Sequence, residues 1–272
     1  MQSASELVKD ALSGPAIHEG WERVYRNPGS ERLYDLVFDW IAQHGGVPAG
    51  SRWLDIGCGI GQHAMRLCRR GYRVVAADFS PDRVRAAGEH IREMGMANDI
   101  TVQREDLVAG LSFAAETFDA VLCWGVLMHI PAVETAMLEL IRMTRPGGKL
   151  FVCEGNLHGV DAAIARLVSL ARGAVGNAQH KQIVMKPLGR EYWLKTEDGE
   201  LLIRHTRMPA MARFFAQHGC RLQARISGEF TERYSQGGAL GRALHAWNAM
   251  WFRRLRSPYF AHGNLMVFEK LI

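Results

Sequence analysis

The chain has 272 residues, of which 48% are hydrophobic and 22% charged, a balance typical of a soluble globular protein with one large domain or a domain plus a cap. It has no apolar run near the roughly 18 residues of a membrane span, no segment typical of a secretion signal and no Cys-x-x-Cys pair among its five cysteines, so we expect a cytoplasmic protein without zinc or disulfides. The net charge of +5 is spread along the chain, which argues against a nucleic-acid partner.

The first half of the chain changes character near residue 46. Residues 1–45 are expected to form a helical cap, with an amphipathic helix over 30–45. Residues 46–155 alternate apolar runs with amphipathic segments. We expect strands at 52–57, 72–79, 99–106, 118–125 and 149–155, and helices at 62–71, 81–94 and 133–144. This alternation predicts a doubly wound α/β fold with its ligand at the carboxyl ends of parallel strands.

The second half is expected to insert residues 156–210 and then to complete the α/β core over 211–272. The insertion contains a helical pattern at 162–176 and a hairpin pattern at 191–206, turned at Asp198-Gly199. After it we expect a helix at 211–219, a strand at 220–227, a helix at 239–256 and a closing strand at 264–272.

The helix expected at 239–256 carries apolar residues at a helical spacing, which predicts a buried stripe. These residues are Leu240, Leu244, Trp247, Trp251 and Leu255. Arginines 253, 254 and 256 follow in its last turn, where the helix dipole favours cations. A basic amphipathic surface anchor is the alternative interpretation.

Residues 53–64 read WLDIGCGIGQHA, a glycine-rich turn that follows a strand. A phosphate loop is excluded because no Gly-Lys-Ser/Thr follows the glycines. The segment Gly59 to Ala64 fits the Gly-x-Gly-x-x-Ala turn of dinucleotide sites, with Asp78 placed 19 residues beyond Gly59. However, Asp55 would then face a pyrophosphate of like charge. A cationic ligand with a ribose and no phosphate suits an acid there, and S-adenosylmethionine is such a ligand.

Two further aspartates follow the next two expected strands, which supports the same ligand. Asp78 can accept hydrogen bonds from both ribose hydroxyls with its two oxygens. Asp106 is placed to accept from the adenine amino group, with the backbone N–H of Leu107 on a ring nitrogen. Three acids at three successive strand ends are more specific than any count of glycines.

The chain resembles the class I S-adenosylmethionine-dependent methyltransferases of the small-molecule type over roughly residues 50–154. The matching segments are LDIGCGIG (54–61), VVAADFSP (74–81), REDL (104–107), FDAVLCWGVLMHI (118–130) and LIRMTRPGGKLFV (140–152). The resemblance implies a Rossmann-like, seven-stranded, mainly parallel sheet with an antiparallel last strand at 264–272. It also implies that the insertion over 156–210 forms a substrate lid.

The family pattern implies a set of cofactor-binding residues. They are Asp55, Gly57, Cys58, Gly59 and Gly61 at the methionine end, Asp78 at the ribose, Phe79, Ser80, Asp106 and Leu107 around the adenine, and Cys123 and Trp124 near the sulfur. Ser80 is also expected to cap the helix that starts at Pro81. Members often carry a glutamate four residues before the histidine of the fourth-strand loop. This chain has Gly125 there, which puts in doubt any acid or base role borrowed for that loop.

The acceptor site is less defined, and His129 is the candidate general base because histidine titrates near neutral pH. Its alternative role is to orient the loop by bonding to backbone. Other candidate substrate residues are Trp21, Tyr25, Glu154, Asn156, Tyr192 and His205. Each of them also has a structural interpretation: a hydrophobic staple, a loop cap or a small hairpin core.

We therefore expect a methyltransferase that modifies a small molecule at oxygen rather than nitrogen, with a secondary metabolite or a sugar-like compound as acceptor. No metal-ligand set is visible. The alternatives are methylation of tRNA or another macromolecule, and a non-catalytic protein that binds S-adenosylmethionine. A homodimer is a candidate assembly.

Overall fold

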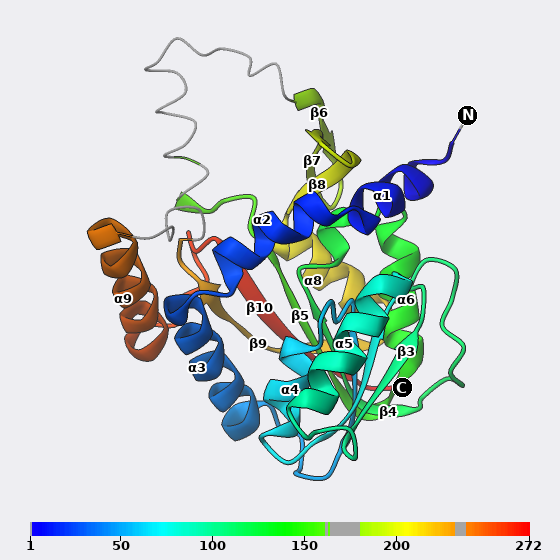
Figure 1. Ribbon diagram of the computed structural model, residues 1–272. Helices are drawn as coiled ribbons and strands as arrows, with labels where there is room; N and C mark the ends of the chain where they lie inside the picture. The colour runs from blue at the N-terminus through cyan, green and yellow to red at the C-terminus, as the bar shows by residue number, and fades with distance from the viewer. Residues whose placement is uncertain (1, 161–162, 164–179, 232–237) are drawn as a thin grey trace. The chain divides into compact units, whose positions relative to one another are not determined.

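The computed structural model describes residues 2–160, 163, 180–231 and 238–272 (Figure 1). The chain forms two compact units. The first unit comprises residues 1–37, 153–213 and 225–265, and the second comprises 38–152, 214–224 and 266–272. Within the described residues no helix is long and apolar enough to cross a bilayer.

The second unit contains the parallel strands that the sequence predicts. Strands β1 (Arg52–Ile56), β2 (Arg73–Asp78), β3 (Ile100–Arg104) and β4 (Phe118–Trp124) pair in parallel, β1 with β2 and β4, and β2 with β3. With β5 (Thr144–Gly155), β10 (Gly263–Lys270) and β9 (Cys220–Glu229) they form, in the described chain, a seven-stranded sheet in the order β3-β2-β1-β4-β5-β10-β9. The strand order reverses at β1 and β4, and in such sheets ligands bind outside the carboxyl ends at this point.

Helices join β1 to β2, β2 to β3 and β4 to β5, and another precedes β9 (Figure 1). They are α4 (Gln62–Cys68), α5 (Pro81–Glu93) and α6 (Val133–Met143), followed later in the chain by α8 (Met208–Gln217). The start of α5 is set locally, because Pro81 occupies its first turn and the Ser80 side chain accepts a hydrogen bond from Arg83 N. Strands β1, β2 and β4 are buried on both faces, as a sheet with helices on both sides requires.

The first unit combines helices with a small antiparallel sheet. Its helices are α1 (Ala4–Ser13), α2 (Pro15–Tyr25) and α9 (Gly238–Arg254), and α3 (Pro28–His44) runs from it into the second unit. The sheet has the order β6-β7-β8 and consists of β6 (His180–Lys186), β7 (Gly189–Thr196) and β8 (Gly199–Thr206). Val8 and Ala11 of α1 pack on Leu201 and Leu202 of β8 in a common apolar cluster.

Most predicted elements are confirmed, and the differences have local causes. Strand β5 starts at Thr144 rather than 149, because Arg145 precedes Pro146 and a residue in that position favours extended backbone. The hairpin turns at Glu197-Asp198, since Thr196 pairs with Gly199. Strand β6 was not predicted. The helical pattern at 162–176 lies outside the described residues except for Ala163, and the boundaries expected for the cap and the insertion stay predictions.

The predicted buried stripe of α9 is wrong. Leu240 is 67% exposed and Trp247 43% exposed, whereas Gly241, Asn248 and Phe252 form the buried face. The polar residue turns inward because its side chain bonds to backbone: Asn248 Oδ1 accepts from Phe230 N and Thr231 N, and its Nδ2 donates to Thr231 O at 2.7 Å. Hydrogen-bond demand thus decided which face of the helix is buried.

Candidate cofactor site

The glycine loop between β1 and α4 has the left-handed backbone that its sequence suggests. Gly57, Gly59 and Gly61 have φ values of 72°, 55° and 81°. A Cβ at Gly57 would lie 2.4 Å from Cγ2 of Val126, and one at Gly61 would lie 3.0 Å from Cδ1 of Ile91. A Cβ at Gly59 would meet nothing within 4 Å. Two of the glycines therefore allow close packing, and Gly59 leaves open space beside the backbone, where a ligand can approach.

The loop is held to the end of β2 before any ligand arrives. Gly57 N and Cys58 N both donate to Ala77 O, at 2.8 and 3.0 Å. Asp78, the last residue of β2, accepts from Gly59 N through Oδ2 at 2.9 Å and from Ser80 N through Oδ1 at 3.0 Å. Asp78 thus fastens the loop from a position 19 residues away in the sequence, a role that sequence analysis did not predict.

Asp78 also keeps capacity for a ligand, because each carboxylate oxygen can accept a further hydrogen bond. Its side chain is buried, and this burial raises its pKa above the ordinary value, against the lowering effect of the Ser80 and Gly59 N–H groups. The ribose contact expected of Asp78 stays a prediction.

Asp55, the fourth residue of β1, is the carboxyl group of the site whose ionised form is most disfavoured. It is only 2% exposed, and its Oδ2 atom has no hydrogen-bond partner among the described residues. Its pKa is raised to about 7, chiefly by burial and also by the neighbouring Asp78, although the Ala64 N–H and the Arg66 guanidinium act to lower it. A buried carboxylate in this state is favourable only beside a cation or as a neutral acid. This orphaned oxygen fits a cationic cofactor such as S-adenosylmethionine.

A basic and aromatic group on α4 completes this side of the site, and the sequence analysis missed it. The buried Arg66 donates from Nη1 to Nδ1 of His63 at 3.3 Å. Because guanidinium can only donate, Nδ1 must accept, which leaves the proton of the neutral ring on Nε2. Burial, with Arg66 beside it, holds the pKa of His63 well below its usual value.

The His63 ring in turn packs against a predicted cofactor residue. Its centroid lies 5.0 Å from the Trp124 ring and 5.0 Å from the Phe38 ring, and the last two rings are 5.9 Å apart. Trp124 is therefore set by ring packing at the carboxyl end of β4. The only sequence signal was the spacing of His63 and Arg66 at i and i+3, directly after the glycine loop.

The turn expected at the adenine follows β3. Asp106 Oδ1 accepts from Val108 N at 3.0 Å and from Ala109 N at 3.4 Å, so the aspartate shapes its own turn. Leu107 is buried. Glu105 N donates to Asp78 O at 3.0 Å, which joins this turn to the end of β2.

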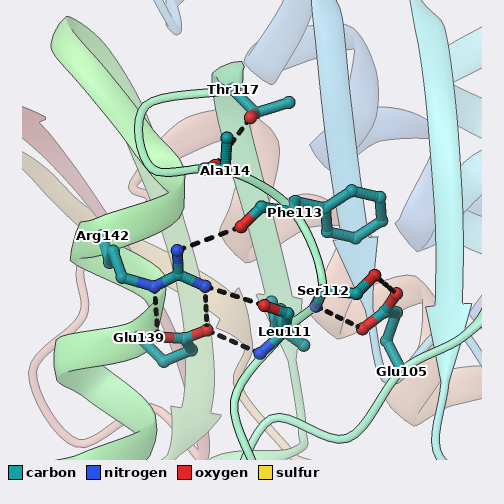
Figure 2. A network of polar contacts seen from close by, with 8 residues as sticks. All are labelled: Glu105, Leu111, Ser112, Phe113, Ala114, Thr117, Glu139 and Arg142. Carbon is teal, nitrogen blue, oxygen red and sulfur yellow. Dashed lines mark hydrogen bonds and ion pairs between the residues drawn. The ribbon is translucent and has the colours of Figure 1, made fainter.

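The loop after this turn is fixed by a network centred on Arg142 of α6, which Figure 2 shows. Arg142 donates to Phe113 O at 3.0 Å and to Leu111 O at 2.9 Å. It also pairs with Glu139 at 2.6 Å, and Glu139 Oε1 accepts from Leu111 N at 2.7 Å. The hydrogen bond from Arg142 lowers the pKa of Glu139. On the other side of the loop, Glu105 accepts from both the backbone N and the hydroxyl of Ser112 (Figure 2).

The remaining predicted residues of the second unit lie at the end of β4 and just beyond it. Cys123 is fully buried, and Gly125 adopts φ 67°. His129 ends the short 3₁₀ turn η1 (Leu127–His129) and is buried, with its backbone N donating to Val126 O at 3.0 Å. Its role as a base stays a prediction. Phe79, half-buried after β2, likewise keeps its expected adenine contact as a prediction.

The other candidate substrate residues belong to the first unit. Asn156 is occupied structurally, because its Nδ2 donates to Ala261 O at 3.0 Å and its Oδ1 accepts from His158 N at 3.1 Å. The hydroxyl of Tyr192 lies 3.5 Å from Nε2 of His205.

Glu154 is buried at the end of β5. Trp21 packs against the apolar cluster of α1 and β8, and Tyr25 ends α2. For all six of these residues, contact with an acceptor stays a prediction.

Comparisons with known proteins place this geometry in context. The profile of the family described as "Methyltransferase domain" matches residues 54–152, from β1 to β5. The chain is 36% identical over 153 residues to a ubiquinone biosynthesis O-methyltransferase of Xanthomonas axonopodis pv. citri, covering 54% of this chain and 62% of that protein. It is 33% identical over 174 residues to the enzyme of that description from Xanthomonas campestris pv. campestris, covering 62% and 70% respectively. The chain thus spans under two thirds of the first of these two relatives.

Solved structures with low sequence identity share the fold. A S-adenosylmethionine-dependent methyltransferase of Methanosarcina mazei superposes with a TM-score of 0.58 at 18% identity, covering 85% of this chain and 97% of that one. The cyclase SpnF superposes with a TM-score of 0.56 at 19% identity, covering 88% and 81%. Because a cyclase shares this architecture, the fold alone does not determine the reaction.

Proposed function

The chain belongs to the class I S-adenosylmethionine-dependent methyltransferases, and we propose that it transfers the methyl group of this cofactor to an oxygen atom of a small molecule. The observation that carries the proposal is the buried pair Asp55 and Asp78 beside the open backbone of Gly59. The relatives named as O-methyltransferases of ubiquinone biosynthesis support oxygen as the acceptor atom and a small molecule as the acceptor.

Three aspartates of the second unit have distinct roles in binding the cofactor. S-adenosylmethionine supplies, when bound, a methyl group activated by a positively charged sulfur. Asp55 provides the negative charge that a cationic ligand needs in a buried site. Asp78 holds the glycine loop and offers its remaining lone pairs to the ribose hydroxyls. The Asp106–Leu107 turn offers polar backbone and carboxylate groups to the adenine.

His129 is the residue that we propose removes the proton of an acceptor hydroxyl. It follows β4, whose carboxyl end also carries Trp124, and it is buried away from bulk water. Histidine is the side chain most often used as a general base. We further propose a cytoplasmic location, supported by the five cysteines, which are all free thiols.

The direct test is incubation of the protein with methyl-labelled S-adenosylmethionine and a panel of phenols, catechols and sugar-like alcohols, followed by mass spectrometry of the products. Transfer to a hydroxyl oxygen is the expected result. Labelled tRNA instead of labelled metabolite would establish the macromolecular alternative. Tight binding without transfer to any compound would favour a non-catalytic role.

The variant His129→Ala tests the base. General-base catalysis is worth about 10²- to 10⁴-fold, so we expect kcat to fall by at least about 100-fold while the cofactor KM stays nearly unchanged. The variant should be slow at every pH at which the wild type is active. Wild-type rates across the whole pH range would remove His129 from the mechanism.

A further inference from the structure

Helix α9 exposes an apolar stripe along one face. Leu240, Trp247 and Met250 are 67%, 43% and 38% exposed, and they lie with Ala243 at positions i, i+3, i+7 and i+10. This spacing places them on one side of a helix. The buried face of α9 carries Gly241, Asn248 and Phe252. The stripe therefore faces away from the contacts that hold the helix in the first unit.

The same segment is basic and contains no acid. Residues 238–262 include four arginines and no aspartate or glutamate, in a chain whose net charge is only +5. The arginines are Arg242, Arg253, Arg254 and Arg256. Within the described part of the chain, none of the four forms an ion pair with a carboxylate. Arg254 continues the apolar stripe at i+14, and Arg253 lies on its flank, so long cationic side chains border the exposed apolar surface.

Hydrogen bonds and ring contacts of α9 fix the orientation of this stripe. The side-chain amide of Asn248 is clamped to residues 230 and 231 by the hydrogen bonds described above. The Trp251 ring packs at a tilt against the Phe230 ring, with centroids 4.5 Å apart, and its Nε1 donates to Ser257 O at 3.0 Å. Trp247 lies 6.0 Å from Trp251 at the exposed edge of this cluster. Burial of Trp247 against a partner would consequently require little ordering of the helix.

The loop after α9 has the same character. Leu255, Tyr259 and Phe260 are exposed. Arg256 and Phe260 adopt left-handed backbone with φ of 49° and 64°, and main-chain bonds hold both, from Ser227 N to Arg256 O and from Val160 N to Phe260 O. A bulky residue keeps such a conformation only where its surroundings enforce it. The structure thus maintains exposed aromatic and basic residues in a defined loop.

We propose that α9 docks the protein on an anionic lipid surface. Leu240, Trp247 and Met250 would enter the headgroup region, and the arginines would pair with lipid phosphates. Charge complementarity selects this occupant. A second copy of the chain would bring like-charged arginine borders together, and a nucleic acid would leave the apolar stripe in water. This inference goes beyond the proposed function and does not depend on it.

Flotation of the full chain with phospholipid vesicles tests the proposal. We expect binding to vesicles of phosphatidylcholine with about 30% phosphatidylglycerol and little binding to pure phosphatidylcholine, because anionic lipid attracts basic segments. The variant Trp247→Glu/Met250→Glu should lower the partition coefficient by about tenfold or more. Arg253→Gln/Arg254→Gln should lower it by a similar factor, since each basic residue near the surface contributes about fivefold.

The matched control is Met94→Glu, which places the same charge on a methionine that is 47% exposed at the end of α5. It should bind vesicles like the wild type, and all variants should keep the wild-type circular dichroism spectrum and melting temperature.

Three results would overturn the proposal. One is equal partition of wild type and α9 variants, or no binding to anionic vesicles at all. Another is that the wild type binds tRNA in fluorescence anisotropy but does not bind vesicles, and that Arg253→Gln/Arg254→Gln abolishes the tRNA binding. The third is a dimer in sedimentation that Trp247→Glu/Met250→Glu dissociates, with no vesicle binding. Because no assay here needs turnover, failure of this proposal is separate from failure of the methyltransferase assignment.

Discussion

Two carboxylates of the second unit, one in helix α6 and one in strand β1, have opposite electrostatic states. Glu139 of α6 is bound by Arg142 and by a backbone N–H, and its pKa is lowered. Asp55 of β1 has an oxygen without a partner in the described chain, and its pKa is raised to about 7. The first arrangement is complete within the protein and holds a loop. The second remains incomplete until a cation arrives, which is the common state of a ligand site.

The largest expected effect follows from Asp78→Ala, which removes the carboxylate that fastens the glycine loop to the end of β2. This variant loses the acceptor for Gly59 N as well as the expected acceptor for the ribose. Because hydrogen bonds to charged groups are worth about 1.5–3 kcal/mol each, we expect cofactor affinity to fall by about 100-fold or more in calorimetry. Asp78→Asn should show a smaller loss, since the amide oxygen can still accept one N–H. Unchanged affinity in the alanine variant would show the ribose assignment to be wrong.

The variant Asp55→Asn should be more stable than the wild type at high pH and yet bind the cofactor more weakly. Between pH values of about 4 and 7 the folded state holds a proton that the unfolded state has released, so the Asp55 contribution to stability falls as the pH rises through this window. Asparagine does not titrate, so the ligand-free variant should melt several degrees higher than wild type at about pH 8, and at about the same temperature near pH 4. If the variant were less stable than the wild type at about pH 8, ionised Asp55 would not destabilise the ligand-free protein as we infer.

The same carboxyl group predicts how cofactor binding depends on pH. Protonated Asp55 offers no charge to a cation, so S-adenosylmethionine affinity should fall below a pH of about 7, by at most about tenfold per pH unit. Binding near that pH should release a proton, which calorimetry in two buffers of different ionisation enthalpy detects. The Asp55→Asn variant is the control, and its weaker binding should show neither effect.

The smallest effects on cofactor binding are expected from changes at Glu139, whose carboxylate is already paired within the protein. Glu139→Gln breaks the pair that holds residues 111–113 (Figure 2), so the loop after the Asp106–Leu107 turn should loosen while all predicted cofactor-binding residues stay in place. We expect affinity for the cofactor to fall by less than about tenfold, together with faster amide exchange at residues 111–113. Arg145→Gln is the matched control, because its exposed pair with Asp119 at 2.9 Å lies at the start of β5, at the opposite ends of the strands. If both variants lowered cofactor affinity equally, residues 111–113 would have no specific role in positioning the binding site.

Much of the candidate site was predictable because its signals are local. The apolar strands, the glycine loop and the cap at Ser80-Pro81 depend on a few adjacent residues. Asp55, Asp78 and Asp106 were found because each stands at the carboxyl end of a strand or directly beyond it, and parallel strands bring such ends together. The support of these residues was not predictable. The contact between Arg142 and Leu111 joins positions 31 residues apart, and the ring packing of Phe38, His63 and Trp124 joins three different elements.

Helix α9 shows the same limit most clearly. Its apolar spacing predicted a buried stripe, but the structure buries Asn248 and exposes Trp247, because an amide that bonds three backbone groups fixes the rotation of the helix. By itself the sequence determined the order of strands and helices, the glycine turn and the three acids, since these follow from periodicity and short motifs. Only the tertiary structure decided which acid is left unsatisfied, which loop is clamped and which helix face meets solvent. Those outcomes depend on desolvation and on hydrogen bonds between residues far apart in the chain.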